Sequence, residues 1–304
     1  MKIFYSDSFV LPLPEGHRFP MQKYAMLRKR VEEAGVCAPG ELRVPRAATD
    51  GELALVHTRG YLEKVKTGTL SRREIRRIGF PWSEQMVERS RRSCGATLEA
   101  AETALLEGFA ANLAGGTHHA FADRGEGYCV FNDVAVAIRT LQREGAVERA
   151  VVIDTDVHQG NGTARIFEGD PSVFTFSIHG AKNFPFHKER SDLDAELMDG
   201  ARDDMYLEAL AEGLKRSLEE SEAEIAFYLA GADAFEEDRL GRLSVSKEAL
   251  AWRDRMVLEA CRRCSLPVVV TMAGGYAREI ENTVEIQLAS IMEAQRMWRL
   301  ERST

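Results

Sequence analysis

The sequence predicts an α/β protein built on one mostly parallel sheet with helices on both of its faces. Three observations support this fold class: strand-like and helix-like stretches alternate along all 304 residues, the strand-like runs are almost wholly apolar, and polar residues follow them. Apolar strands are typical of a sheet buried on both faces, and β-α alternation is typical of parallel connections. Because no repeat or flexible linker interrupts the pattern, we expect a single domain over residues 1–304.

Two periodicities define the expected elements. The N-terminal segment MKIFYSDSF lacks the hydrophobic core of a signal peptide and is instead expected to form the first strand. Apolar residues at helical spacing predict the helices, and short apolar runs between them predict the remaining strands. The expected helices cover residues 21–35, 84–107, 133–145, 204–220, 246–263 and 278–300. The expected strands cover residues 109–114, 149–154, 173–178, 224–230 and 266–272.

Composition restricts the classes of partner and compartment. The net charge of −8 argues against a general binder of nucleic acid or anionic membranes, and no run of 18 apolar residues spans a bilayer. The four arginines within residues 72–77 have helical spacing and are interpreted as a solvated helix face. Five cysteines without framework spacing fit a reducing cytoplasm. Cys261 and Cys264 lack a second pair, so they are expected to be ordinary helix cysteines rather than a zinc knuckle.

The most informative stretch of the chain is VVIDTDVHQGNG, residues 151–162. Its β-branched start predicts a buried strand, after which Asp154, Asp156 and His158 occupy alternate positions and therefore face one side. Buried acids beside a histidine are costly unless they are compensated, and carboxylate and imidazole are ordinary zinc ligands. The stretch therefore favours a divalent metal site over a capped strand end with solvated acids.

Polar residues capable of catalysis follow four of the expected strands. They are His118 and His119 after 109–114, Asp156 and His158 after 149–154, Asp233 after 224–230, and Tyr276 after 266–272. In parallel sheets, ligands bind at the carboxyl ends of the strands. Together these four strand ends predict the rim of an active site.

The metal-binding part of this site is predicted to be Asp156, His158 and Asp233. Three such ligands leave room on zinc for water and substrate, and zinc activates water and polarises a carbonyl group. Tyr276, after two glycines, is placed to donate a hydrogen bond to the oxyanion that develops on an attacked carbonyl. The combination predicts metal-assisted amide hydrolysis.

The two adjacent histidines are the candidates for proton transfer. One of His118 and His119 is expected to act as the general base, and the other as general acid or electrostatic partner. Asp154 and Asn161 are suited to orient the two imidazoles by hydrogen bonds. The spacing leaves open which histidine takes which role.

Five segments resemble, in order, the motif set of the zinc-dependent histone deacetylase family, which includes bacterial deacetylases, acetylpolyamine amidohydrolases and acetoin-utilisation proteins. The segments are GGTHHA, GYCVFNDVAVA, VVIDTDVHQGNGTA, YLAGADAF and MAGGYA. Two others, PLPEGHRFPM and AKNFPFHKERSDLD, resemble the class IV branch and its bacterial relatives. The resemblance runs from about residue 5 to 280. It implies the three-layer arginase/deacetylase fold, with a central, mostly parallel eight-stranded sheet.

The resemblance also implies roles for individual residues. It makes Asp156, His158 and Asp233 the zinc ligands, His118 and His119 the acid/base pair, and Tyr276 the oxyanion donor. It implies a structural potassium ion near Asp154, Asp156, His158, Ser177 and Ile178. It places Gly127, Tyr128 and Phe184 along the narrow channel that holds an acyl-lysine stem, where aromatic walls suit an aliphatic chain.

Two positions depart from the family pattern. Asn161 stands where many members carry an aspartate, which reduces the charge beside its histidine. In the stretch IGFPW, Pro81 and Trp82 stand where class I enzymes present an aspartate at the channel rim. Anchoring of a peptide backbone by a rim carboxylate is therefore not expected.

The leading functional hypothesis is a cytoplasmic zinc hydrolase that removes acetyl or longer acyl groups from lysine side chains of proteins. The nearest alternative is a deacetylase of polyamines or other small amides, for which Glu15, Asp123 and Glu126 are candidate acidic contacts. A ureohydrolase would need a further acidic metal ligand where Gly160 stands. A non-catalytic binding protein would be expected to lack a ligand or the tyrosine, and neither is missing.

Overall fold

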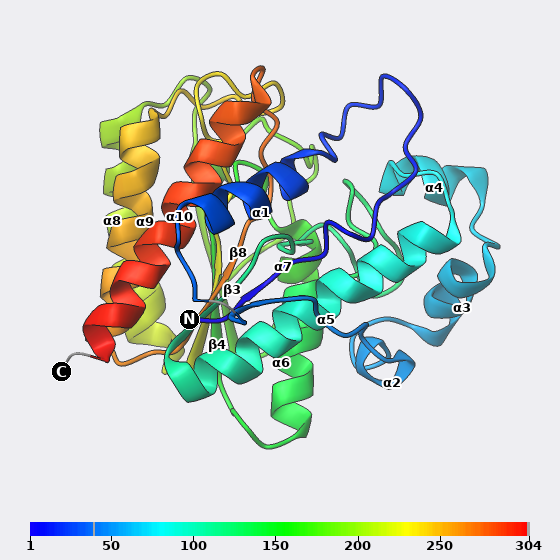
Figure 1. The fold of residues 1–304 in the computed structure, drawn as a ribbon, viewed down its shortest axis with the longest axis horizontal. Helices are drawn as coiled ribbons and strands as arrows, with labels where there is room; N and C mark the ends of the chain where they lie inside the picture. The colour runs from blue at the N-terminus through cyan, green and yellow to red at the C-terminus, as the bar shows by residue number, and fades with distance from the viewer. Residues whose placement is uncertain (39, 303–304) are drawn as a thin grey trace.

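Eight strands form one sheet in the order β2-β1-β3-β8-β7-β4-β5-β6, and all of their pairings are parallel. The computed structural model describes residues 1–38 and 40–302 (Figure 1). The strands are β1 Ile3–Phe4, β2 Leu42–Arg43, β3 Phe109–Asn112, β4 Ala150–Asp154, β5 Val173–Gly180, β6 Leu193–Leu197, β7 Ile225–Leu229 and β8 Val268–Thr271. The predicted eight-stranded sheet is confirmed.

Helices of very different length connect these strands. They are α1 Lys23–Glu33, α2 Asp50–Leu53, α3 Arg59–Thr67, α4 Arg72–Ile78, α5 Glu84–Glu107, α6 Asp133–Arg143, α7 Asn161–Phe167, α8 Asp203–Ser221, α9 Lys247–Arg263 and α10 Ile280–Glu301. All six helices expected from apolar periodicity are present, and the arginine cluster of residues 72–77 does form a helix, α4.

The short elements were not predicted, because they show neither a continuous apolar run nor helical periodicity. β6, with the sequence LDAEL, forms the sheet edge and is only partly buried, so it has no apolar run. β2 has two residues and pairs only with β1. α7 has only seven residues and contains Gly162, so it shows no extended helical periodicity.

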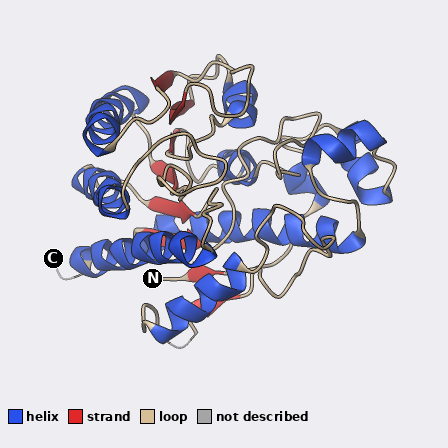
Figure 2. Cartoon of the chain, turned by 90° about the horizontal axis from the view of Figure 1, so that it is seen from above, coloured by secondary structure: helices blue, strands red, loops and turns tan. Residues whose placement is uncertain are grey.

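The sheet has helices on both of its faces, as Figure 2 shows from above. Alternation along β4 assigns its side chains to the two faces: Val151 and Ile153 join the core covered by α1, α8, α9 and α10, and Val152 joins the core covered by α5, α6 and α7. A third apolar cluster lies where α2, α3 and α4 pack outside α5. Burial on both faces is the reason why the strand sequences are continuously apolar.

Parallel pairing brings the carboxyl ends of the strands to one edge of the sheet. β4 lies between β5 and β7, so that Asp154 pairs in register with Ser177 on one side and Leu229 on the other. The loops after β3, β4, β5, β7 and β8 therefore start from neighbouring points. This is the edge at which ligands bind in sheets of this kind.

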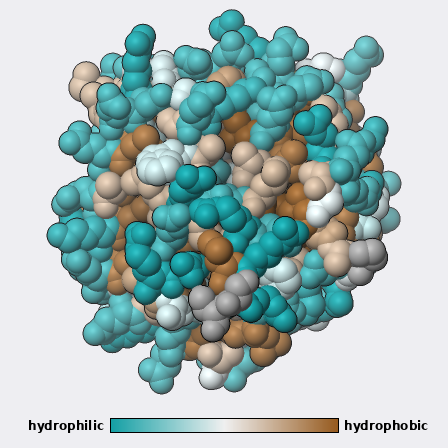
Figure 3. Space-filling view, turned by 60° about the vertical axis from the view of Figure 1, so that its left-hand side comes forward, coloured by the Kyte–Doolittle hydropathy of each residue, from teal (hydrophilic) through white to brown (hydrophobic). Residues whose placement is uncertain are grey.

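None of the described helices is long and apolar enough to cross a membrane. Hydrophilic side chains cover most of the face shown in Figure 3, with hydrophobic residues visible in the furrows between them.

A buried ion pair connects the sheet with two helices on one face. Arg253 and Asp254 of α9 are 0% and 1% exposed, and the Asp254 carboxylate accepts hydrogen bonds from Tyr228 Oη at 2.5 Å and Ser290 Oγ at 2.6 Å. Arg253 donates to the Asp254 carboxylate and to the carbonyl of Gly231. The pair thus joins α9 to β7, to α10 and to the loop after β7.

We expect Asp254→Ala to lower the free energy of unfolding by about 3–5 kcal/mol, because it leaves the Arg253 guanidinium buried without its carboxylate. Urea unfolding followed by circular dichroism measures this change. Arg263→Ala, on the exposed end of the same helix, is the control and is expected to cost about 0.5 kcal/mol or less. Equal stability of the two variants would contradict the assignment.

Candidate active site

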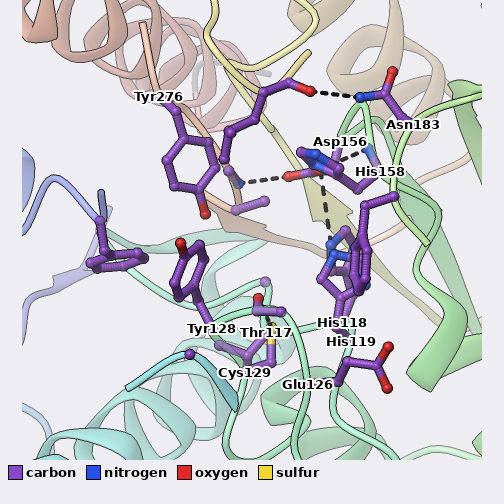
Figure 4. Close-up of a pocket in the computed structure, with 18 of the residues that line it drawn as sticks. Thr117, His118, His119, Glu126, Tyr128, Cys129, Asp156, His158, Asn183 and Tyr276 are labelled. Carbon is purple, nitrogen blue, oxygen red and sulfur yellow. Dashed lines mark hydrogen bonds and ion pairs between the residues drawn. The ribbon is translucent and has the colours of Figure 1, made fainter. Parts of the chain in front are cut away.

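A cavity of about 670 Å³ opens at the carboxyl edge of the sheet. Its lining comes from five strand-end loops, from α4 and from the N-terminal segment. Figure 4 shows His118, His119, Asp156 and His158 on one side, with Tyr276 and Tyr128 opposite them. The structure therefore brings together residues that the sequence separates by more than 150 positions.

Asp156, His158 and Asp233 form a buried cluster at the inner end of this cavity. Their donor atoms all lie within 4.8 Å of one another, and among the described residues they form the one group of three or more His, Cys, Asp or Glu so arranged. His158 Nδ1 lies 2.9 Å from Asp156 Oδ1 and 3.2 Å from Asp233 Oδ2. Two carboxylates and one imidazole are a donor set that fits zinc.

The backbone packs closely around these carboxylates. Gly274 N–H donates to Asp156 Oδ2 at 2.6 Å, and the Val157 N–H donates to Asp233 Oδ1 at 2.9 Å. A Cβ atom at Gly274 would lie 1.9 Å from Asp233 Oδ2. Glycine is therefore required at this position for steric reasons, and the loop after β8 fixes the orientation of the acids.

The environment shifts the pKa values of the two acids in opposite directions. Burial disfavours the charge on Asp156, but the His118 and His158 imidazoles outweigh it and hold the pKa of this carboxyl well below its usual range. Burial and the neighbouring Asp156 carboxylate raise the pKa of Asp233 to about 7. Two buried carboxylates at this separation repel each other, so a divalent cation is the compensation that their arrangement fits.

Each of the adjacent histidines has its own partner. His118 Nδ1 lies 2.7 Å from Asp154 Oδ2, and His119 Nδ1 lies 2.7 Å from Asn161 Oδ1. All four side chains are buried. The pairing predicted from the sequence is thus present in the geometry, with one charged partner and one neutral partner.

The surroundings of the two imidazoles shift their pKa values in opposite directions. Burial opposes protonation of His118, but the Asp154 and Asp156 carboxylates outweigh it and raise its pKa to about 9. Burial, together with the nearby His118 and His158 imidazoles, lowers the pKa of His119 well below its usual value. His118 is therefore suited to carry a positive charge, and His119 is suited to remain neutral.

Tyr276 lies across the cavity from the histidines, with its hydroxyl pointing into the space between them (Figure 4). Its backbone N–H donates to Asp238 Oδ2 at 2.6 Å, which ties the loop after β8 to the loop after β7. Burial raises the pKa of Tyr276 well above its usual value, so the hydroxyl keeps its proton and can donate it in a hydrogen bond.

Lys23 contacts the same loop, and the sequence did not indicate this contact. It is 0% exposed, and its Nζ lies 3.3 Å from the Gly275 carbonyl oxygen and 5.2 Å from the centroid of the Tyr276 ring. A fully buried lysine is rare, and this one is compensated by carbonyls and aromatic faces. Helical periodicity places Lys23 within the helix expected over residues 21–35 but does not indicate its burial.

The expected channel residues do line the cavity. The Phe184 ring lies edge-on to His119 with their centroids 4.9 Å apart, and Tyr128 faces Tyr276 at 6.1 Å. Gly127 has φ +55°, and a Cβ atom there would lie 2.6 Å from the His119 ring. Aromatic rings therefore form opposite walls that lead to the histidines.

Pro81 and Trp82 do not line the cavity. Trp82 Nε1 donates to the Val65 carbonyl oxygen at 2.7 Å, so its ring packs against α3 instead. Ile78 and Gly79 occupy this part of the lining. The residues that match the rim aspartate of class I enzymes thus lie outside the lining, beyond the left-handed Gly79 that ends α4.

Cys261 is buried in α9 and Cys264 is exposed at its end, as expected of ordinary helix cysteines. Of the three acids considered for polyamine binding, Glu126 lines the cavity and the other two do not.

A match to the Histone deacetylase domain model covers residues 17–291. The chain belongs to the histone deacetylase family. The motif-based prediction of this family is therefore confirmed.

Known proteins resemble this histone deacetylase family member over most of their length. It is 44% identical over 282 residues to an uncharacterized protein of Picosynechococcus sp., covering 93% of this chain and 94% of that protein. It is 30% identical to histone deacetylase 2 of Arabidopsis thaliana, covering 94% and 78%. A solved HDAC homolog from Aquifex aeolicus has a TM-score of 0.84 at 25% identity, covering 97% and 84%. The predicted fold is that of the known family structures.

Asp133 is a second residue that the sequence did not single out, and it supports the loop bearing both histidines. It is 0% exposed, and its carboxylate accepts hydrogen bonds from the backbone N–H groups of Gly116 at 3.0 Å and Thr117 at 2.7 Å. The Thr97 and Thr117 hydroxyls donate to it as well. The first residue of α6 therefore fixes the segment immediately before His118.

We expect Asp133→Asn to lower kcat/KM on the family's amide substrates about 100-fold while bound metal is retained, because the amide replaces an acceptor and misplaces the histidine loop. Steady-state kinetics with metal analysis measures both quantities. Asp204→Asn, on the exposed start of α8, is the matched control. Full activity of Asp133→Asn would contradict this role.

Proposed function

We propose that this protein is a zinc-dependent amidohydrolase that removes acetyl or longer acyl groups from lysine side chains of proteins. The observation that carries the proposal is the buried Asp156–His158–Asp233 cluster beside the two histidines, at the inner end of a cavity with aromatic walls. Membership of the histone deacetylase family supports the same reaction class.

Asp156, His158 and Asp233 would hold the zinc ion. Such an ion supplies Lewis acid chemistry, which lowers the pKa of water and polarises the amide carbonyl. The potassium ion that the resemblance implies belongs to the proposal in the same way. Its proposed ligand residues include Asp154 and Ser177, which pair in register at the end of β4.

We assign the general base to His119, a choice that the sequence left open. Its Nδ1–H donates to the neutral Asn161 amide, so the imidazole stays neutral and its Nε2 is left as an acceptor for a proton from water. The same proton can then pass to the leaving lysine amine as the carbon–nitrogen bond breaks. His118, paired with the Asp154 carboxylate, would remain protonated and stabilise developing negative charge.

Tyr276 supplies the remaining function. Its protonated hydroxyl points into the space opposite the histidines, where the carbonyl oxygen of the scissile amide would become an oxyanion (Figure 4). A hydrogen bond that strengthens as this charge develops stabilises the transition state more than the bound substrate.

The walls and entrance favour an acyl-lysine over an acetylated polyamine. Tyr128 and Phe184 provide aromatic faces for an uncharged aliphatic stem. Several arginine and lysine side chains at the entrance would repel the distal amines of a polyamine. Glu126, the one carboxylate of the described lining outside the metal cluster, would offset little of this repulsion. A series of acetyl, butyryl, octanoyl and myristoyl lysine peptides would establish the preferred acyl group.

We expect Tyr276→Phe to lower kcat on an acyl-lysine peptide about 100- to 1000-fold, because the oxyanion loses its donor. His119→Ala is expected to lower kcat about 100- to 10,000-fold through loss of the base. Tyr5→Phe, whose hydroxyl lies outside the cavity lining, is the control for removal of a tyrosine hydroxyl. Undiminished turnover by Tyr276→Phe and His119→Ala would refute the proposed mechanism.

Removal of the metal is expected to abolish turnover, and zinc is expected to restore it. Asp233→Asn should lower both the zinc content per chain and kcat/KM, the latter at least about 100-fold, because one anionic ligand is lost. Elemental analysis of the purified protein and of Asp204→Asn as control measures the metal directly. An enzyme that is fully active after chelation would exclude the zinc hydrolase.

A further inference from the structure

The entrance of the cavity carries cations from three separate segments. Arg76 and Arg77 lie on α4, Lys182 follows β5, and Arg239 and Arg242 lie in the loop after β7. All five residues line the cavity and are exposed, so they lie at its mouth. Because the whole chain has a net charge of −8, this positive charge is a local feature and not a property of the surface in general.

Nearby carboxylates offset only part of this charge. Glu126 lies 4.0 Å from Arg77 Nε and 3.7 Å from Arg124 Nε, so that one acid is shared by two arginines. Asp199 pairs with Arg242 at 3.1 Å. An excess of positive charge therefore remains at the mouth.

Three of the cations keep their charge available to a ligand. The side chains of Arg76 and Lys182 have no hydrogen-bond or ion-pair partner within residues 1–38 and 40–302. Arg239 donates to the carbonyl oxygens of Tyr276 at 3.2 Å and Ala277 at 3.4 Å. These neutral acceptors fix the guanidinium beside the Tyr276 loop without cancelling its charge.

The acids nearest to Arg239 in sequence do not change this balance at the mouth. Glu236 and Glu237 do not line the cavity, and Glu237 accepts a hydrogen bond from Asn282 instead. Asp238 is 9% exposed, and its carboxylate accepts backbone N–H groups of Leu240 and Gly241.

Resting on the deacylase function proposed above, we propose that the mouth selects acyl-lysines that lie in acidic segments of proteins. Aspartate or glutamate residues flanking the modified lysine would meet Arg76, Lys182 and Arg239. Exposed cations around a cleft raise the local concentration of an anionic substrate and its rate of association. Their spread over three segments suits an extended chain with acids on both sides of the lysine.

The test uses three peptides of equal length around the same acyl-lysine, with acidic, neutral amide or basic flanking residues. We expect kcat/KM to be about tenfold higher for the acidic than for the neutral peptide at low ionic strength, and lowest for the basic one. The advantage should fall to about twofold at about 0.5 M salt, because exposed charges are screened.

Two double variants separate the mouth from the rest of the surface. Arg76→Gln with Lys182→Gln is expected to lower the acidic-to-neutral ratio about threefold or more. Arg143→Gln with Arg263→Gln removes the same charge at the helix ends that lead into the opposite edge of the sheet, and should preserve the ratio. Lys182→Gln alone is the second variant if the double substitution at the mouth does not fold.

The outcomes distinguish this inference from the proposed function. Equal kcat/KM on all three peptides, or a ratio unaffected by salt and by the mouth variants, would overturn the acidic preference and leave the deacylase intact. No turnover of any peptide, with turnover of acetylspermidine, would overturn both proposals.

Discussion

The burial of three carboxylates at one edge of the sheet is the constraint on which the rest of the site depends. Asp154, Asp156 and Asp233 are at most 3% exposed, and such groups are costly unless each is compensated. The compensation comes from the imidazoles of His118 and His158 and from backbone N–H groups, among them that of Gly274. The same groups form the Asp156–His158–Asp233 cluster and the His118–Asp154 pair, so the contacts that stabilise the fold here also build the candidate site.

The parallel sheet makes this concentration of charge possible, because its carboxyl edge collects loops from β3, β4, β7 and β8. Two of these loops are fixed by buried polar residues from other segments of the chain. Asp133 of α6 holds the histidine loop, whereas Asp238 and Lys23 hold the loop that bears Tyr276. The side chains of the candidate site are thus positioned by contacts between segments far apart in the chain.

The sequence predicted the long elements and the residues that meet at the candidate site, but not the residues that hold them in place. β4 and α5 were predictable because their burial imposes a continuous apolar run or helical periodicity, whereas partly buried β6 imposes neither. Asp156 and His158 were recognisable from their spacing. Lys23 was not, since only tertiary structure shows a lysine buried beneath Tyr276. Trp82 packs against α3 instead of lining the cavity, a contact that only the tertiary structure shows.

Charge is divided along the depth of the cavity, with acids at its inner end and cations at its mouth. The rings of Tyr128 and Phe184 line the same cavity, and the Phe184 ring packs edge-on against His119. If the acids and the cations paired with one another, the mouth would have no charge left for a ligand. Instead, the acids pair with imidazoles and backbone N–H groups, and the side chains of Arg76 and Lys182 have no partner in the described chain. The aliphatic side chain of an acyl-lysine can therefore pass between the aromatic rings while charged residues on either side of that lysine remain at the mouth. The mouth can thus discriminate between substrates without altering the chemistry at the inner end of the cavity.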